Sequence, residues 1–189
     1  MPFTYTTRRG KTYYLHTGPK RGGGTQHYLS TDPKGPPAET IPEGFEIYET
    51  PNGQVYLRKI KASHIQPDEL AWVEGELQKR QTHKHRYLAE ISGDKIIIYQ
   101  GDTRIDALRE INMRFSAPAL EEYAARNADF VPVMRFVLQD DAQRLFEPQR
   151  YCFRGSVEDW ISIGGPNQLK ELAATFLKHL GQDSFYELY

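Results

Sequence analysis

Residues 86–99, RYLAEISGDKIIIY, are the stretch that decides the fold. Residues 86–91 and 95–99 are two short runs rich in apolar and aromatic side chains, and Ser-Gly-Asp at 92–94 separates them. Short apolar runs joined by a glycine-containing turn are typical of a β-hairpin. The three consecutive isoleucines at 96–98 form a short, fully apolar run, which is typical of a central strand of a sheet.

The segments that follow this hairpin predict more strands and helices. After the isoleucine strand come a short helix at 105–111 and a helix that opens at Ser116-Ala117-Pro118, where proline is favoured. Strands are predicted at 133–138, 149–154 and 160–163, with a turn at Asp140-Asp141. The last helix has an apolar face from Leu169 to Leu180, with Asn167 as its N-cap and Gly181 at its end.

A further helix is predicted at 66–80, just before the hairpin. Proline and two acids occupy its first turn, and Leu70, Val73 and Leu77 recur at helical spacing. Strands and helices do not alternate strictly along the chain. The sequence therefore predicts an α+β fold: a mixed or antiparallel sheet, helices packed on one face, and an amphipathic C-terminal helix.

Residues 1–62 predict a small N-terminal β module with two hairpins. The first hairpin joins strands at 13–16 and 26–30, and the second joins 45–49 to 54–59 through Pro-Asn-Gly at 51–53. Asn-Gly is a strong hairpin signal because both residues tolerate positive φ. A proline-rich loop or tether connects the hairpins. We therefore expect a 1–62 module and a 63–189 α+β domain, with one continuous globule as the alternative.

Composition excludes several classes of protein. The chain has 189 residues, 39% hydrophobic and 26% charged, with a formal net charge of −1. These values are ordinary for a soluble globular protein, and the near-zero charge gives no overall attraction to a polyanion. One cysteine, Cys152, allows no internal disulfide. Neither a secretory signal nor an apolar run of membrane-spanning length is seen, so we expect a cytoplasmic protein without membrane association or cofactor.

The first hairpin is the strongest candidate for contact with a partner. Residues 1–35 carry six Lys and Arg against one acid, and a glycine-rich tip at 20–24 lies between aromatic strands. Cations would neutralise phosphates, and tyrosines could stack on unpaired bases, so nucleic acid or another anion is the predicted ligand. The predicted binding residues are Arg8, Arg9, Lys11, Tyr13, Tyr14, Lys20, Arg21 and Tyr28.

Two observations weigh against simple readings of this hairpin. The glycines at 22–24 lack the spacing and the following helix of a phosphate-binding loop, so a flexible tip is the better interpretation. Residues 36–50 carry only acids among their charged residues, and these carboxylates could neutralise the hairpin in the fold. The acids are Glu39, Glu43, Glu46 and Glu49.

Metal and catalytic sites receive little support. His83 and His85 are spaced as two ligands on one strand face, and His16 and His27 could lie across the first hairpin, but no known ligand spacing is complete. Cys152 reads as a buried thiol. We predict no metal and no catalytic residue. Besides nucleic-acid binding, two alternatives stay open: a protein-interaction or regulatory subunit with a surface around Tyr48 and Tyr56, and an enzyme whose site no motif reveals.

Overall fold

The computed structural model describes residues 2–80, 86–102, 116–154 and 157–188. The chain forms two compact units, Met1–Lys61 and Ala62–Tyr189. Each unit is described by itself below, and the two-domain organisation stays a prediction.

The Met1–Lys61 unit contains the two predicted hairpins. Its first sheet has the order β1-β2-β3 and is antiparallel, and its second sheet pairs β4 with β5. The proline-rich segment, which connects the two sheets in the sequence, runs along β2. Ala38 N–H donates to Leu15 O at 2.9 Å, and Thr17 N–H donates to Pro36 O at 2.9 Å. The segment is therefore part of the fold. The strands are β1 (Thr4–Thr6), β2 (Thr12–Pro19), β3 (Thr25–Ser30), β4 (Phe45–Glu49) and β5 (Val55–Lys59).

The Ala62–Tyr189 unit is built on an antiparallel sheet of order β10-β9-β8-β7-β6, so the predicted sheet is antiparallel in all its described pairs. The predicted hairpin at 86–99 forms β6 and the start of β7, and the isoleucine strand has neighbours on both sides. Three strands, β8, β9 and β10, begin earlier than predicted, because their pairing continues into positions without strong strand signals. The strands are β6 (Tyr87–Ile91), β7 (Lys95–Asp102), β8 (Asp129–Asp140), β9 (Leu145–Arg154) and β10 (Val157–Ser162).

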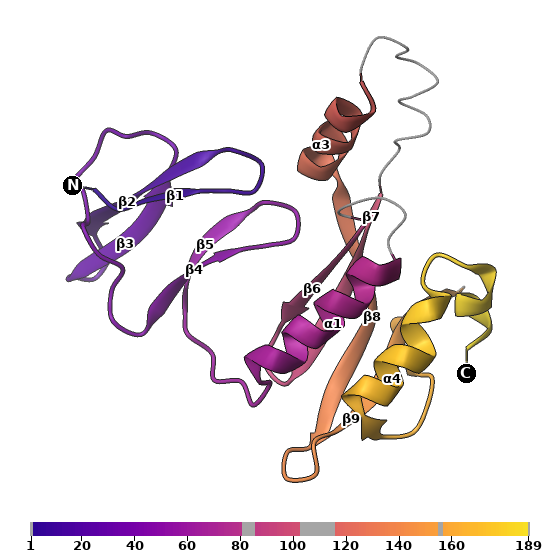
Figure 1. Cartoon of the computed structure of the whole chain (residues 1–189). Helices are drawn as coiled ribbons and strands as arrows, with labels where there is room; N and C mark the ends of the chain where they lie inside the picture. Colours follow the sequence, from indigo (N-terminus) through magenta and orange to yellow (C-terminus); the bar gives the residue numbers. More distant parts are fainter. Residues whose placement is uncertain (1, 81–85, 103–115, 155–156, 189) are drawn as a thin grey trace. The chain divides into compact units, whose positions relative to one another are not determined.

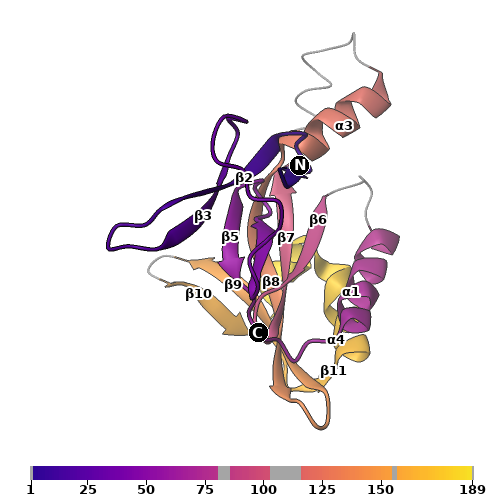
Figure 2. The ribbon, with the colours of Figure 1, turned by 90° about the vertical axis from the view of Figure 1, so that its left-hand side faces the viewer.

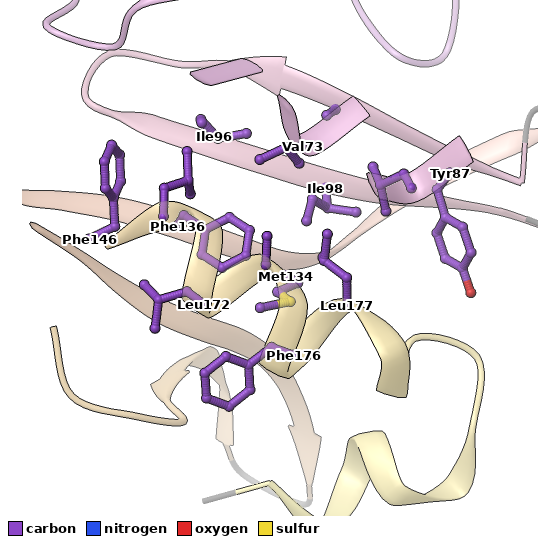
Figure 3. Packing of buried hydrophobic residues seen from close by; sticks show 14 of the residues in the cluster. Val73, Tyr87, Ile96, Ile98, Met134, Phe136, Phe146, Leu172, Phe176 and Leu177 are labelled. Carbon is purple, nitrogen blue, oxygen red and sulfur yellow. The ribbon is translucent and has the colours of Figure 1, made fainter. Parts of the chain in front are cut away.

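Helices α1 (Pro67–Arg80) and α4 (Leu169–Phe176) lie on the same face of this sheet, as Figures 1 and 2 show. Their apolar faces meet the central strands in one cluster, shown in Figure 3. Its fully buried side chains include Val73 of α1, Ile96 and Ile98 of β7, and Met134 and Phe136 of β8. The prediction of helices on one face is thus confirmed for α1 and α4.

A third helix, α3 (Ala117–Asn127), begins where Ser116-Ala117-Pro118 predicts it. The helix predicted at 105–111 lies outside the described residues. Among the helices that the structure describes, none is long and apolar enough to span a membrane.

The C-terminal helix corrects one prediction. Asn167 is not the N-cap; it lies in the short strand β11 (Asn167–Gln168), which pairs with β9, and Gln168 precedes the first helical residue. The Asn167 side chain instead donates to the Glu171 carboxylate at 2.8 Å. The α-helix also ends earlier than predicted, at Phe176, and the 3-10 helices η1 (Leu177–His179) and η2 (Asp183–Glu187) follow. The predicted apolar face is buried, from Leu169 to Leu177.

Candidate functional site

The tip of the first hairpin is a five-residue turn closed by its own backbone. Lys20 N–H donates to Gly24 O at 3.0 Å, and Gly23 N–H donates to Lys20 O at 3.0 Å. Gly22, Gly23 and Gly24 all have positive φ, between 90° and 98°. A side chain at any of these positions would strain the backbone, which explains the glycine run. A strand, β3, follows the tip, as the sequence predicts, so the glycines do not lead into a helix as those of a phosphate loop do.

The strand register divides the predicted tyrosines between two faces. Tyr13 pairs with Tyr5, and it shares a face with Leu15. Tyr14 and Tyr28 lie on the other face, because His16 pairs with Tyr28 and Tyr14 is two residues before His16. The three tyrosines therefore do not form one stacking surface, and only Tyr14 and Tyr28 remain candidates for the same ligand.

Tyr28 is the exposed aromatic residue of this face, at 41% exposure. Its ring lies against Gly18 on the neighbouring strand, where an added Cβ would stand 3.2 Å from Tyr28 Cε1. The His16 ring is 5.5 Å away, centre to centre. Neighbouring β2 thus supports the ring while part of it stays open to solvent.

The acidic segment pairs with cations away from the tip. Glu49 accepts hydrogen bonds from Tyr5 Oη at 2.9 Å and Arg8 Nε at 3.1 Å, and its side chain is only 4% exposed. Glu46 accepts one from Arg58 Nε at 2.8 Å. Glu49 lies on the same face of β4 as Ile47, and its side chain is buried. The acidic segment was predicted to neutralise the basic residues of 1–35. Glu49 of this segment does pair with one of them, Arg8.

Lys20 and Arg21 are not neutralised. Both are exposed at the tip, and among the residues that the structure describes neither forms an ion pair. Lys11 lies 5.4 Å from the centre of the Tyr13 ring, and the Arg9 side chain packs near Gly53 of the second hairpin. The eight predicted residues are therefore spread over the unit. The first hairpin carries both the two tip cations, which form no ion pair among the described residues, and the exposed ring of Tyr28.

The two units differ in charge. Met1–Lys61 carries nine Lys and Arg against five Asp and Glu, a net of four positive, whereas the remaining residues carry 15 against 20, a net of five negative. The net charge of the chain hides this difference. A polyanion is attracted to the first unit and repelled by the second.

The described histidines, His16, His27, His64 and His179, do not gather in a metal site. His16 and His27 lie on opposite faces, since His16 pairs with Tyr28 and His27 with Thr17, so the predicted approach across the hairpin is wrong. His16 is 1% exposed and donates through Nε2 to Asp32 O at 3.0 Å. His83 and His85 lie outside the described residues. Within the described ranges, no three His, Cys, Asp or Glu side chains gather as metal ligands would.

The surface predicted around Tyr48 and Tyr56 is partly covered. These tyrosines are a cross-strand pair, and the Arg58 guanidinium lies 3.5 Å from the centre of the Tyr48 ring. Tyr56 is exposed, and β4 has no second strand partner among the described residues. Cys152 is buried in β9, as predicted.

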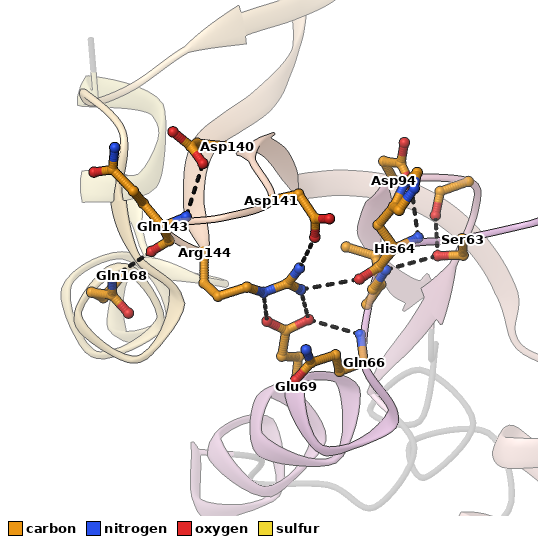
Figure 4. A network of polar contacts seen from close by, with 12 residues as sticks. Ser63, His64, Gln66, Glu69, Asp94, Asp140, Asp141, Gln143, Arg144 and Gln168 are labelled. Carbon is orange, nitrogen blue, oxygen red and sulfur yellow. Dashed lines mark hydrogen bonds and ion pairs between the residues drawn. The ribbon is translucent and has the colours of Figure 1, made fainter.

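Sequence reasoning missed one polar network, shown in Figure 4. Arg144, in the β8–β9 turn, donates to both carboxylate oxygens of Glu69 in α1, at 3.0 and 2.5 Å. It also donates to Asp141 and to His64 O. A pocket of about 460 Å³ adjoins this network, lined in part by Trp72 and Lys170. Because Glu69 and Arg144 are far apart in the sequence, no local pattern could have indicated the pair.

Comparison with models of protein families, with curated proteins and with solved structures found no match to this chain.

Proposed function

We propose that the Met1–Lys61 unit binds single-stranded nucleic acid at the tip of its first hairpin. The observation that carries the proposal is the pair of exposed cations, Lys20 and Arg21, which form no ion pair among the described residues. The carboxylates of Glu46 and Glu49 in the acidic segment are occupied by Arg58 and Arg8. Cations that are not neutralised within a protein are available to phosphates.

Tyr28 favours a single strand over a duplex. Its partly exposed ring is supported by Gly18 and lies on the hairpin that carries the cations. Unpaired bases stack on such rings irrespective of their identity, whereas bases inside a duplex have no free face. The positive net charge of the unit favours the same class of ligand.

Reversal of the two tip cations tests the proposal. In the full chain, Lys20→Glu with Arg21→Glu should weaken binding of a fluorescent oligo(dT) by at least about tenfold at low salt. The salt dependence should also become shallower by about 1.4 in the slope of log K against log salt, since each single-strand phosphate contact contributes about 0.7. Fluorescence anisotropy over a salt series measures both quantities.

The matched control reverses two cations of the same unit outside the hairpin, Lys59→Glu with Lys61→Glu. Both residues are exposed, as are Lys20 and Arg21. Because each double variant reverses two cations, the net charge of the unit changes by the same amount in both. The tip variant should lose far more affinity than this control. Equal losses, binding that survives the tip reversal, or a wild-type chain that does not bind oligo(dT) at low salt would overturn the proposal. A stronger affinity for a duplex of equal length would also contradict it.

Tyr28 provides an independent prediction. Tyr28→Ala should weaken oligo(dT) binding by about tenfold, because stacking of one base on an aromatic ring is worth roughly 1–3 kcal/mol. Tyr28→Phe should bind like the wild type, because the ring is retained. Tyr13→Ala, on the opposite face of the sheet, is the control and should change affinity little. If Tyr28→Ala and Tyr28→Phe bind equally well, the ring does not stack on a base.

A protein partner is the second candidate, favoured by the unpaired edge of β4 and by exposed Tyr56 among the described residues. An extended peptide could add a strand to such an edge through backbone hydrogen bonds. Failure of the wild-type chain to bind nucleic acid would direct attention to this edge.

A further inference from the structure

The pocket beside the Glu69–Arg144 pair lies entirely within the Ala62–Tyr189 unit. Its wall comes from the N-terminal part of α1, the start of α4 and the β8–β9 turn. Its volume is about 460 Å³. Pockets for small molecules usually measure about 300–1,000 Å³, so this one has room for a single small ligand.

The protein itself uses the ion pair in this wall. The Glu69 carboxylate accepts hydrogen bonds from Arg144 Nε at 3.0 Å, from Arg144 Nη2 at 2.5 Å and from the Gln66 N–H at 2.8 Å. In Figure 4, the guanidinium of Arg144 lies between this carboxylate, Asp141 and His64 O, to all of which it donates. The pair therefore has an internal structural role, and other side chains of the wall determine which ligand the pocket favours.

Two further side chains of the wall, Asp68 and Lys170, carry charges of opposite sign. Both residues are exposed, and neither forms an ion pair among the described residues. The wall holds two carboxylates, Asp68 and Glu69, and two cations, Arg144 and Lys170, so its net charge is zero. A simple anion would be repelled by Asp68, and a simple cation by Lys170. Complementarity therefore favours a ligand that carries both charges.

Trp72 provides an aromatic surface next to both of these charges. Its side chain lines the pocket, and the residue is 39% exposed. Asp68 lies four residues before Trp72 in α1, so the two side chains are neighbours on one face of the helix. The Lys170 ammonium lies 4.6 Å from the centre of the Trp72 ring. A ligand that meets both charges therefore also meets the ring.

We propose that this pocket binds an α-amino acid with an aromatic side chain, in its zwitterionic form. The ammonium of the ligand pairs with Asp68, its carboxylate pairs with Lys170, and its ring packs against Trp72. This site is separate from the nucleic-acid site proposed for the Met1–Lys61 unit, and neither proposal depends on the other.

L-Phenylalanine is the probe, and three compounds that each lack one of its groups are the comparisons. They are 3-phenylpropanoate, which lacks the ammonium, 2-phenylethylamine, which lacks the carboxylate, and L-alanine, which lacks the ring. Calorimetric titration of the full chain at pH 7 should show that phenylalanine binds. Each comparison compound should bind at least about fivefold more weakly, because it loses one charged contact or the aromatic contact.

Two charge variants should change the preference for these compounds in opposite directions. Asp68→Asn should bind phenylalanine at least about fivefold more weakly and 3-phenylpropanoate more tightly than the wild type, because a repelling carboxylate is removed. Lys170→Gln should likewise lose affinity for phenylalanine and gain affinity for 2-phenylethylamine. Asp183→Asn and Lys178→Gln, exposed residues of the same unit that do not line the pocket, are the matched controls and should bind every compound like the wild type.

A change in preference separates direct contact from damage to the fold, because a damaged pocket would weaken binding of all four compounds. The proposal is overturned if Asp68→Asn and Lys170→Gln alter all affinities alike, or if either variant binds phenylalanine as tightly as the wild type. It is also overturned if the wild type binds no phenylalanine at millimolar concentration, or if any comparison compound binds as tightly as phenylalanine.

Discussion

Phe136→Ala is expected to lower the free energy of unfolding of the Ala62–Tyr189 unit by about 3–5 kcal/mol, the usual cost of truncating a buried phenylalanine. Phe136 is 0% exposed. It lies on central strand β8 between Ile96 of β7 and Pro148 of β9, and it belongs to the cluster covered by α1 and α4. Because the ring is fully buried in this close-packed cluster, the surrounding structure can fill only part of the cavity that alanine would leave.

The chain offers a selective reporter for this measurement. Its two tryptophans, Trp72 and Trp160, both belong to the Ala62–Tyr189 unit, so fluorescence during denaturant unfolding follows this unit alone. Phe153→Ala in β9 is the control, because Phe153 is 66% exposed and should change stability by no more than about 0.5 kcal/mol. A similar loss in both variants would mean that the cluster in Figure 3 is not the core of the unit.

Arg144→Met should cost the same unit about 2–3 kcal/mol. Breaking a fully buried ion pair costs roughly 3–5 kcal/mol because one charge is left without a partner, and here Arg144 is 23% and Glu69 12% exposed. Methionine keeps much of the aliphatic packing and removes the donors to Glu69, to Asp141 and to His64 O. These bonds tie the start of α1 to the β8–β9 turn, so their loss should loosen both.

A double-mutant cycle identifies the origin of this loss. If the unpaired Glu69 carboxylate is the main cost, Arg144→Met combined with Glu69→Met should be more stable than the sum of the single changes by about 1 kcal/mol or more. Arg126→Met removes the exposed partner of Glu122 in α3 and is the control, with an expected loss below about 0.5 kcal/mol. Additive single changes would show that the loss does not arise from the unpaired Glu69 carboxylate.

Local signals predicted most of the fold. Ser92-Gly93-Asp94 and Asn52-Gly53 each occupy the turn of a hairpin, because a glycine there supplies the positive φ that the turn requires. The apolar spacing of Val73 and Leu77 predicted the buried face of α1 for an equally local reason. Such rules act over a few residues, and the sequence shows them directly.

The errors arose where distant residues decide the structure. Asn167 has the chemistry of an N-cap, yet pairing with Phe146 of β9 draws it into a strand. A glutamate in a strand gives no local sign of burial, but the Glu49 carboxylate is buried because Tyr5 of β1 and Arg8, which are distant in the sequence, donate hydrogen bonds to it. For the candidate site, the exposed tip was visible in the sequence, whereas the division of Tyr13 from Tyr28 depends on the register.

The order of strands in the Ala62–Tyr189 sheet has a consequence for how this unit folds. Every neighbouring pair from β6 to β10 is consecutive in the chain, and in three of the four pairs the connecting segment has at most four residues. The pair β7–β8 differs, because residues 103–128 intervene. The entropic cost of closing a loop grows slowly with its length, and among these four pairs it is largest for the long β7–β8 connection. The rate of folding therefore depends on the pairing of two locally formed parts of the sheet, β6–β7 and β8–β10. This pairing places Phe136 opposite Ile96.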